Sequence, residues 1–412
     1  MSDAPVSDQS VSDAAAPDAV GTTPTRPARP PRRRRRRALG HVPALDGFRG
    51  VAVLLVLTWH LPVLSLWWLT RRPGGGLFGV DMFLVLSGFL ITGLLLRESA
   101  RTGRVRIGAF YRRRALRLLP ALVVLLGAWL VYGGVSAIEP RTEPATSLSV
   151  LFYYSNTRWS PGVFEFTYGL GHLWTLSLEE QFYMLWPLCF AALFAWRRSA
   201  VAAVGGTVLA IVTVWAVRSA LYFDGMSTQT LYRSLFSRAD SLLIGALVAQ
   251  LWTRGFAPRR GVKPAAWIAL GGFVYAAWRG LSWSFLSRGG YTLLALAVGV
   301  MILAVVDTDW SPRRVLEWAP LRGVGRISYG LYLWHIPVYI VVQRTFPDLP
   351  TWPRTALALG ATFAVTLGSW HLVEQPFLRW KDRIERRARA GVGASAPADP
   401  GAVAVTDGGV GT

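Results

Sequence analysis

The chain is poor in cysteine and in charged residues. Cys189 is the single cysteine among 412 residues, so no disulfide can form within the chain. Charged residues make up 16% of the sequence against 52% hydrophobic residues, which leaves too little polar surface to cover a soluble globule of this size. These shortages exclude a fold held by internal disulfides and a soluble globular enzyme. They indicate a polytopic membrane protein.

Acidic residues are also scarce. The sequence has 23 acidic and 44 basic residues, which gives a net charge of +21. Such an excess can indicate a nucleic-acid-binding protein. Here, however, the basic residues alternate with long apolar stretches and do not gather in one polar domain. Membrane topology therefore explains the charge better, and no nucleic-acid partner is expected.

Apolar stretches of about 17 to 25 residues predict an all-α fold, a transmembrane bundle of about ten helices. The expected ranges are 44–66, 77–97, 116–136, 173–196, 199–221, 236–252, 265–281, 290–306, 325–343 and 354–377. Most arginines and lysines fall in the two tails and in the even-numbered loops. The positive-inside rule then predicts two cytoplasmic termini in a multi-pass protein of the cell (plasma) membrane.

The two ends of the chain differ in composition from its middle. Residues 1–43 are rich in proline, alanine, aspartate and arginine without periodicity, and residues 381–412 are rich in glycine and alanine after a basic cluster. Both compositions predict disordered tails around a membrane domain at 44–380. No cleavable signal peptide is expected, because the first apolar segment starts after residue 40.

Arg49 and His60 are the two ionisable residues that the first apolar segment should tolerate least. Their eleven-residue separation corresponds to about 1100° of helical rotation, so both side chains fall on one face, roughly 16 Å apart along the axis. This spacing predicts an arginine near one entrance of the bilayer and an imidazole near its middle. A neutral imidazole suits general-base chemistry, whereas a histidine bonded to a neighbouring helix for packing is the alternative.

Three carboxylates also lie in apolar surroundings. Asp81 stands near the start of the second expected helix, where it could orient His60, bind substrate or merely cap its helix. Glu179 and Glu180 are adjacent and point about 100° apart, so we expect one to face a cavity and the other to pair with a neighbouring helix. The sequence leaves open which one does which. The catalytic candidates are therefore His60, Glu180, Glu179 and Asp81, and no metal site is expected.

Basic and polar residues at helical spacing suggest where a ligand binds. Arg113 and Arg114 precede Arg117 by four and three residues, which groups guanidinium groups at the membrane surface in a geometry suited to phosphates. Simple anchoring of basic residues at the cytoplasmic face is the alternative. A second stripe lines one face of the ninth expected helix and consists of Ser328, Tyr332 and His335.

Five motifs in order resemble the acyltransferase-3 family of integral membrane O-acyltransferases, over roughly residues 44–380. They are the Arg49-x10-His60 pair, the run GVDMFLVLSGF at 79–89, the Arg114-x-x-Arg117 pair, HLWTLSLEEQFY at 172–183 and SYGLYLWH at 328–335. Each motif alone is weak evidence, whereas their shared order is specific. Some members of the family carry an additional hydrolase-like domain at the C-terminus, and we expect none here.

The resemblance implies an enzyme that transfers an acyl group, commonly acetyl, from cytoplasmic acyl-CoA to a hydroxyl of a carbohydrate such as a cell-envelope glycan. His60 matches the family's essential histidine. Arg49, Arg114 and Arg117, with Arg113 beside them, are the expected contacts for the CoA phosphates. Together with the stripe residues Ser328, Tyr332 and His335 they form the predicted acyl-CoA site, without a metal.

Alternatives remain for the acceptor, the mechanism and the class of protein. The acceptor could be a lipid or a glycosylated secondary metabolite such as a macrolide. His60 could deprotonate the acceptor hydroxyl or carry the acyl group itself as an acyl-imidazole. Ten helices with charges inside the membrane would also suit a proton-coupled transporter, although no inverted repeat supports that class.

Overall fold

The computed structural model describes residues 40–61, 75–135, 143–157, 169–196, 200–255 and 261–394. Within these ranges the chain forms α-helices with short 3-10 and π-helical segments and contains no strand, which confirms the all-α class for this part of the protein. The elements are α1 (Pro43–His60), α2 (Gly75–Thr102), α3 (Ile107–Val135), α4 (Glu143–Leu151), η2 (Ser155–Thr157), η3 (Gly171–Leu173), α5 (Trp174–Trp196), α6 (Ala200–Phe223), α7 (Thr228–Arg233), α8 (Leu235–Thr253), α9 (Val262–Arg279), α10 (Trp283–Phe285), η4 (Leu286–Gly290), α11 (Tyr291–Asp307), α12 (Pro312–Leu316), α13 (Ala319–Arg326), α14 (Ser328–Thr345), α15 (Thr351–Ser369), η5 (Trp370–Glu374) and α16 (Gln375–Ala394).

Every one of the ten expected apolar ranges overlaps a helix of the structure. Among the described residues, five helices are long and apolar enough to cross a membrane, and they lie at 75–102, 107–135, 201–223, 283–307 and 351–384. Ten crossings and two cytoplasmic termini therefore stay predictions. The last helix, α16, begins at Gln375 and continues to Ala394. Its arginine-rich sequence favours helix. The expected domain boundaries at 43 and 380 stay predictions.

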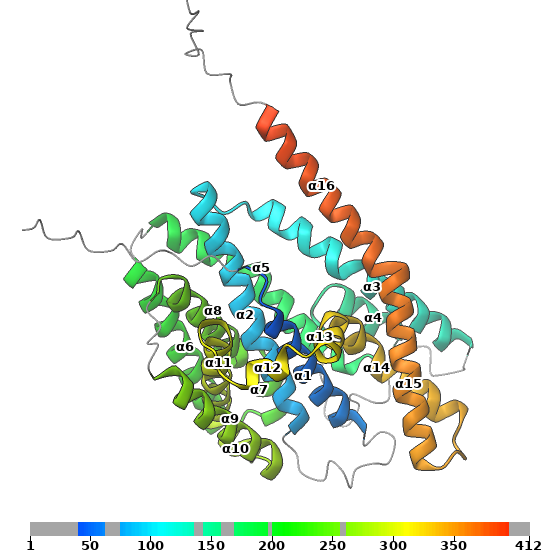
Figure 1. Cartoon of the computed structure of the whole chain (residues 1–412). Helices are drawn as coiled ribbons and strands as arrows, with labels where there is room; N and C mark the ends of the chain where they lie inside the picture. The colour runs from blue at the N-terminus through cyan, green and yellow to red at the C-terminus, as the bar shows by residue number, and fades with distance from the viewer. Residues whose placement is uncertain are drawn as a thin grey trace, which may run out of the picture. The chain divides into compact units, whose positions relative to one another are not determined.

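Helix α1 packs between two groups of helices (Figure 1). On one side α2 packs against α1 and α8, and α8 in turn contacts α6 and α11. On the other side α1 contacts α13 and α14, while α14 packs against α15 and α3. Buried side chains of α5 contribute to the hydrophobic cores of both groups. The first expected helix, α1, carries Arg49 and His60. It thereby lies beside α14, the ninth expected helix.

The contact between α2 and α8 requires glycine on both helices. A Cβ atom on Gly88 would lie 1.8 Å from the carbonyl oxygen of Leu242, and one on Gly245 would lie 1.9 Å from that of Val85. Only residues without a side chain let two helix backbones approach this closely, which is the usual basis of tight helix packing in membranes. The position of α2, and of the residues that it carries, therefore depends on these two glycines.

Candidate functional site

Helix α1 holds Arg49 and His60 on one face, as their spacing predicts. The helix ends at His60, earlier than the expected end at residue 66, and residues 62–66 lie outside the described part of the chain. Pro62 explains the early end, because proline has no N–H group and cannot donate the next helical hydrogen bond. His60 consequently lies in the last turn of α1, and its expected depth near the middle of the bilayer stays a prediction.

Three of the five histidines of the chain converge beside the end of α1. His335 of α14 places its Nε2 3.3 Å from Nδ1 of His60, with the two ring centroids 5.0 Å apart. His172 of η3 lies edge-on to His335, with ring centroids 4.7 Å apart. His335 thus contacts His60, while its expected place in the acyl-CoA site stays a prediction. His172 was not among the predicted site residues, although it opens one of the five motifs.

A proline in α14 explains how His172 binds this helix. Pro337 has no N–H group, so it cannot make the helical hydrogen bond to the carbonyl of Leu333 four residues earlier. His172 Nε2 lies 3.3 Å from that carbonyl oxygen and 3.0 Å from the carbonyl oxygen of Tyr332. The imidazole N–H thus satisfies a backbone group that the proline leaves without its helical partner.

Tyr332 attaches α14 to α5 beside the histidines. Its hydroxyl donates to the carbonyl oxygen of His172 and also contacts the hydroxyl of Thr175. Ser328, one turn earlier on the same stripe, is buried, and its hydroxyl has no hydrogen-bond partner among the described residues. The stripe therefore pairs α14 with α5 through Tyr332 and lines the histidine cluster through His335.

The two adjacent glutamates of α5 have different partners. Arg114 donates to Glu180 from Nε, at 2.8 and 2.9 Å from the two carboxylate oxygens, and from Nη2 at 2.5 Å. The same guanidinium lies 3.3 Å from the centre of the Tyr183 ring. Glu179 instead accepts from the Ser87 hydroxyl at 3.2 Å. Glu180 is therefore the carboxylate that pairs with a neighbouring helix.

Two further arginines lie close to this pair without acidic partners of their own. Arg49 is half-buried and Arg117 is exposed, and neither makes a hydrogen bond or ion pair with any residue that the structure describes. The positive charges of Arg49, Arg114 and Arg117 repel one another. Asp46, one turn before Arg49, accepts instead from His41 at 3.0 Å. This excess of accessible positive charge is an arrangement that can bind an anion.

Arg113 does not join this group. Its Nη2 lies 3.4 Å from a carboxylate oxygen of Glu98, in a partly exposed ion pair on the preceding helix. Of the three arginines predicted to bind phosphate together, the structure therefore offers Arg117 as accessible and unpaired, Arg114 as paired with a glutamate, and Arg113 as part of a separate surface contact.

Asp81 lies in a second, fully buried charge cluster. Its carboxylate accepts from Nη2 of Arg238, whose guanidinium lies 3.8 Å from the centre of the Tyr291 ring. The structure thus gives Asp81 a partner that the sequence argument had not assigned to it. Orienting His60 was one of three roles left open for this carboxylate, and the hydrogen bond it makes in the structure is to Arg238 of α8.

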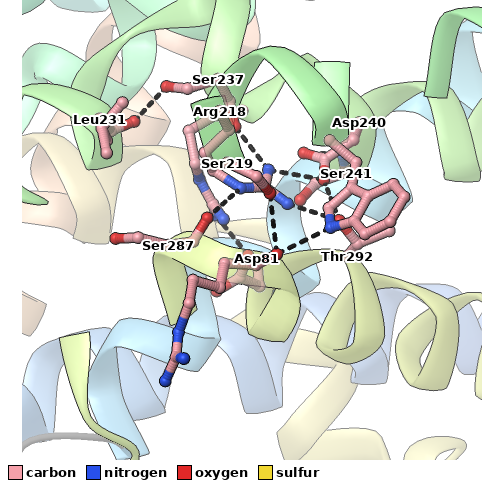
Figure 2. Close-up of polar contacts among 12 residues, drawn as sticks. Asp81, Arg218, Ser219, Leu231, Ser237, Asp240, Ser241, Ser287 and Thr292 are labelled. Carbon is pink, nitrogen blue, oxygen red and sulfur yellow. Dashed lines mark hydrogen bonds and ion pairs between the residues drawn. The ribbon is translucent and has the colours of Figure 1, made fainter. Parts of the chain in front are cut away.

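A neighbouring buried pair joins α6, α8 and α11. Arg218 donates to Asp240 at 2.7 Å and to the carbonyl oxygens of Ser237 and Ser287 at 2.6 and 3.1 Å, as Figure 2 shows. Thr292 donates to the same carboxylate at 2.6 Å. Both charged side chains have no exposed surface, so this network holds three helices together and is closed to a large ligand.

Comparison of the sequence with known proteins identifies its family. The family model described as "Acyltransferase domain" matches residues 42–373. The peptidoglycan O-acetyltransferase OatA of Listeria monocytogenes is 30% identical over 362 residues, which is 82% of this chain and 56% of that protein. The putative peptidoglycan O-acetyltransferase YrhL of Bacillus subtilis is 30% identical over 82% of this chain and 55% of that protein, and the O-acetyltransferase OatA of Staphylococcus aureus is 28% identical over 74% and 52%.

The chain spans about half the length of these curated relatives. No solved structure matches it significantly. The match to the family model covers the five motifs, the histidine cluster and the arginines beside it. The chain belongs to the acyltransferase-3 family of membrane acyltransferases.

Proposed function

We propose that the protein transfers an acetyl group from acyl-CoA at the cytoplasmic side of the membrane to a hydroxyl of a cell-envelope glycan. The observation that carries this proposal is the pairing, on one face of α1, of an arginine without an acidic partner and a histidine within a cluster of imidazoles. The names of the relatives support acetyl as the group transferred and peptidoglycan as the first acceptor to test.

Arg49 and Arg117 are the best candidates for binding the donor phosphates. Both arginines are accessible and have no carboxylate partner in the described part of the chain, whereas Arg114 already neutralises Glu180. A guanidinium that holds a phosphate contributes about 1.5–3 kcal/mol through charge-assisted hydrogen bonds. The distance of about 16 Å from Arg49 to His60 along α1 then suits a donor whose anionic end and reactive end are well separated.

His60 is placed to act as the general base. Its Nδ1 lies 2.9 Å from the carbonyl oxygen of Val56, so this nitrogen carries the proton and Nε2 carries the lone pair. Nε2 takes the proton of the acceptor hydroxyl as its oxygen attacks the thioester carbonyl carbon. The carbon–sulfur bond breaks, and the thiolate that leaves takes the proton back from the imidazolium. An acyl-imidazole on Nε2 is the covalent alternative, and mass spectrometry of rapidly quenched protein distinguishes the two.

The test uses purified full-length protein in vesicles, radiolabelled acetyl-CoA and soluble peptidoglycan fragments. We expect labelled acceptor from the native protein and a loss of about 10²–10⁴-fold in kcat for His60→Gln, the range that a general base contributes. His371→Gln is the matched control, because His371 is exposed in η5, between α15 and α16, and should leave the rate unchanged.

Donor binding is tested separately with Arg49→Ala and Arg117→Ala. Each change should raise the KM for acetyl-CoA about 10- to 100-fold, which corresponds to about 1.5–3 kcal/mol. Arg113→Ala is the control, since Arg113 pairs with Glu98. Full activity of His60→Gln would refute the proposal. Transfer to a lipid or small glycoside, with none to peptidoglycan, would correct the acceptor, and uptake of unmodified solute would favour a transporter.

A further inference from the structure

His335 makes direct contact with the proposed base and is itself completely buried. Its Nε2 lies 3.3 Å from Nδ1 of His60. A hydrogen bond between two imidazole rings requires that one nitrogen carry a proton and that the other present a lone pair. The partners of the other ring nitrogens determine which imidazole is the donor and which is the acceptor.

The backbone of α14 fixes the protonation of His335. Its Nδ1 lies 2.8 Å from the carbonyl oxygen of Tyr332 and 3.1 Å from that of Leu331. Carbonyl oxygens only accept hydrogen bonds, so Nδ1 of His335 carries the proton and its Nε2 presents the lone pair. His60 must then be the donor in the bond between the rings. Its Nδ1–H therefore points at two acceptors, the Val56 carbonyl oxygen and the His335 imidazole.

We propose that His335 is a positioning residue that fixes the tautomer and ring orientation of His60, so that Nε2 of His60 is the basic nitrogen. This inference rests on the proposed function for its consequence in catalysis. When Nε2 takes a proton, the acceptors at Nδ1 stabilise the imidazolium, as a carboxylate does in other histidine sites. A neutral imidazole in that role avoids burying a further charge within the bundle.

His172 extends the same arrangement by one residue. It donates to the Tyr332 carbonyl oxygen, the same atom that accepts from His335, and its ring lies edge-on against the His335 ring. The carboxylates that could have oriented His60 hold other partners, since Glu180 binds Arg114 and Asp81 binds Arg238. The contacts in the structure thus give the orienting role to an imidazole.

A direct test measures the protonation state of His60 in the native protein. The full-length protein, labelled with 15N-histidine, is studied by NMR in lipid nanodiscs, and the His60 signals are assigned by their loss in His60→Gln. We expect Nδ1 of His60 to show the shift of a protonated nitrogen and Nε2 that of a nitrogen with a lone pair. The opposite tautomer, or an equal mixture of both, would overturn the inference.

Two substitutions of similar size test the consequence. His335→Leu removes the acceptor, whereas His335→Gln keeps an amide N–H for the Tyr332 carbonyl and an oxygen for the His60 N–H. We expect His335→Leu to mix the His60 tautomers and to lower kcat about 100-fold, with the KM for acetyl-CoA unchanged within twofold. The kcat of His335→Gln should be at least tenfold higher than that of His335→Leu.

The matched control is Tyr339→Phe on the same helix. The Tyr339 ring contacts His335, and its hydroxyl has no hydrogen-bond partner among the described residues, so its loss should change neither spectrum nor rate. Equal activity of His335→Leu and the native protein, or equal losses in the leucine and glutamine variants, would refute the positioning role. If the native protein transfers no acyl group, the proposed function fails, whereas the tautomer measurement still decides the structural inference.

Discussion

The ion pair between Arg114 and Glu180 provides a sharp test of what the arginine does. Three contacts of 2.5 to 2.9 Å join the two side chains, and their exposed fractions are 20% and 7%. Removing one partner of a buried pair costs about 3–5 kcal/mol, because the other charge is left without compensation. Arg114 keeps some exposed surface, so we expect about 3 kcal/mol for Glu180→Gln.

The assay is a double-mutant cycle of Arg114→Gln, Glu180→Gln and the double variant, measured by thermal unfolding in detergent and by acetyl-transfer kinetics. A loss of about 3 kcal/mol should lower the unfolding temperature by roughly 5 °C in each single variant. The double variant should recover most of that loss, since it leaves no unpaired charge. Glu98→Gln is the control, because its pair with Arg113 is partly exposed and contributes little.

The kinetics separate the two roles. If Arg114 mainly neutralises Glu180, the KM for acetyl-CoA should change less in Arg114→Gln than in Arg49→Ala. A 10-fold or larger increase in that KM, undiminished in the double variant, would show that Arg114 holds the donor and would refute our reasoning.

Three further predictions concern packing and helix geometry. Asp240→Ala should destabilise the protein by about 3–5 kcal/mol, because Arg218 stays buried without its counter-charge, while Asp309→Ala in the exposed pair with Lys263 should not change the unfolding temperature. Gly245→Ala should abolish a monodisperse peak in size-exclusion chromatography, because its Cβ would lie 1.9 Å from a backbone carbonyl oxygen. Gly271→Ala should be tolerated, because a Cβ there meets open space. Equal behaviour of the two variants would contradict this account. Pro337→Ala should raise the unfolding temperature and lower kcat about tenfold, since the new N–H competes with His172 for the Leu333 carbonyl. An unchanged kcat would show that this contact of His172 does not support the site.

Periodicity predicted what shares a helix face, and it could not predict what lies opposite. The spacing of Arg49 and His60 and the stripe with Tyr332 and His335 follow from 3.6 residues per turn, and the structure agrees with both. The partners of Arg114 and Asp81 lie 66 and 157 residues away in the chain. Such pairings depend on which helices become neighbours, and the periodicity of a single helix carries no information about that.

The end of α1 at His60 is different, because the sequence itself contains a signal for it. Pro62 follows Leu61 and predicts a helix end near His60. Likewise Pro337, four residues after Leu333, leaves a carbonyl without its helical donor and predicts that another group must bind there. His172 is that group in the structure, although Pro337 alone predicts only the need for a donor and not its identity.

Because Arg49 and His60 belong to one uninterrupted helix, α1 works as a molecular ruler. No hinge or loop lies between the two side chains, so the interval between them cannot stretch to suit a longer or shorter ligand. Inserting a single alanine between them would advance the histidine by about 1.5 Å and turn it by about 100° away from α14. The eleven-residue interval therefore sets both the axial distance and the relative rotation of the two side chains. An insertion or deletion in evolution would change both together.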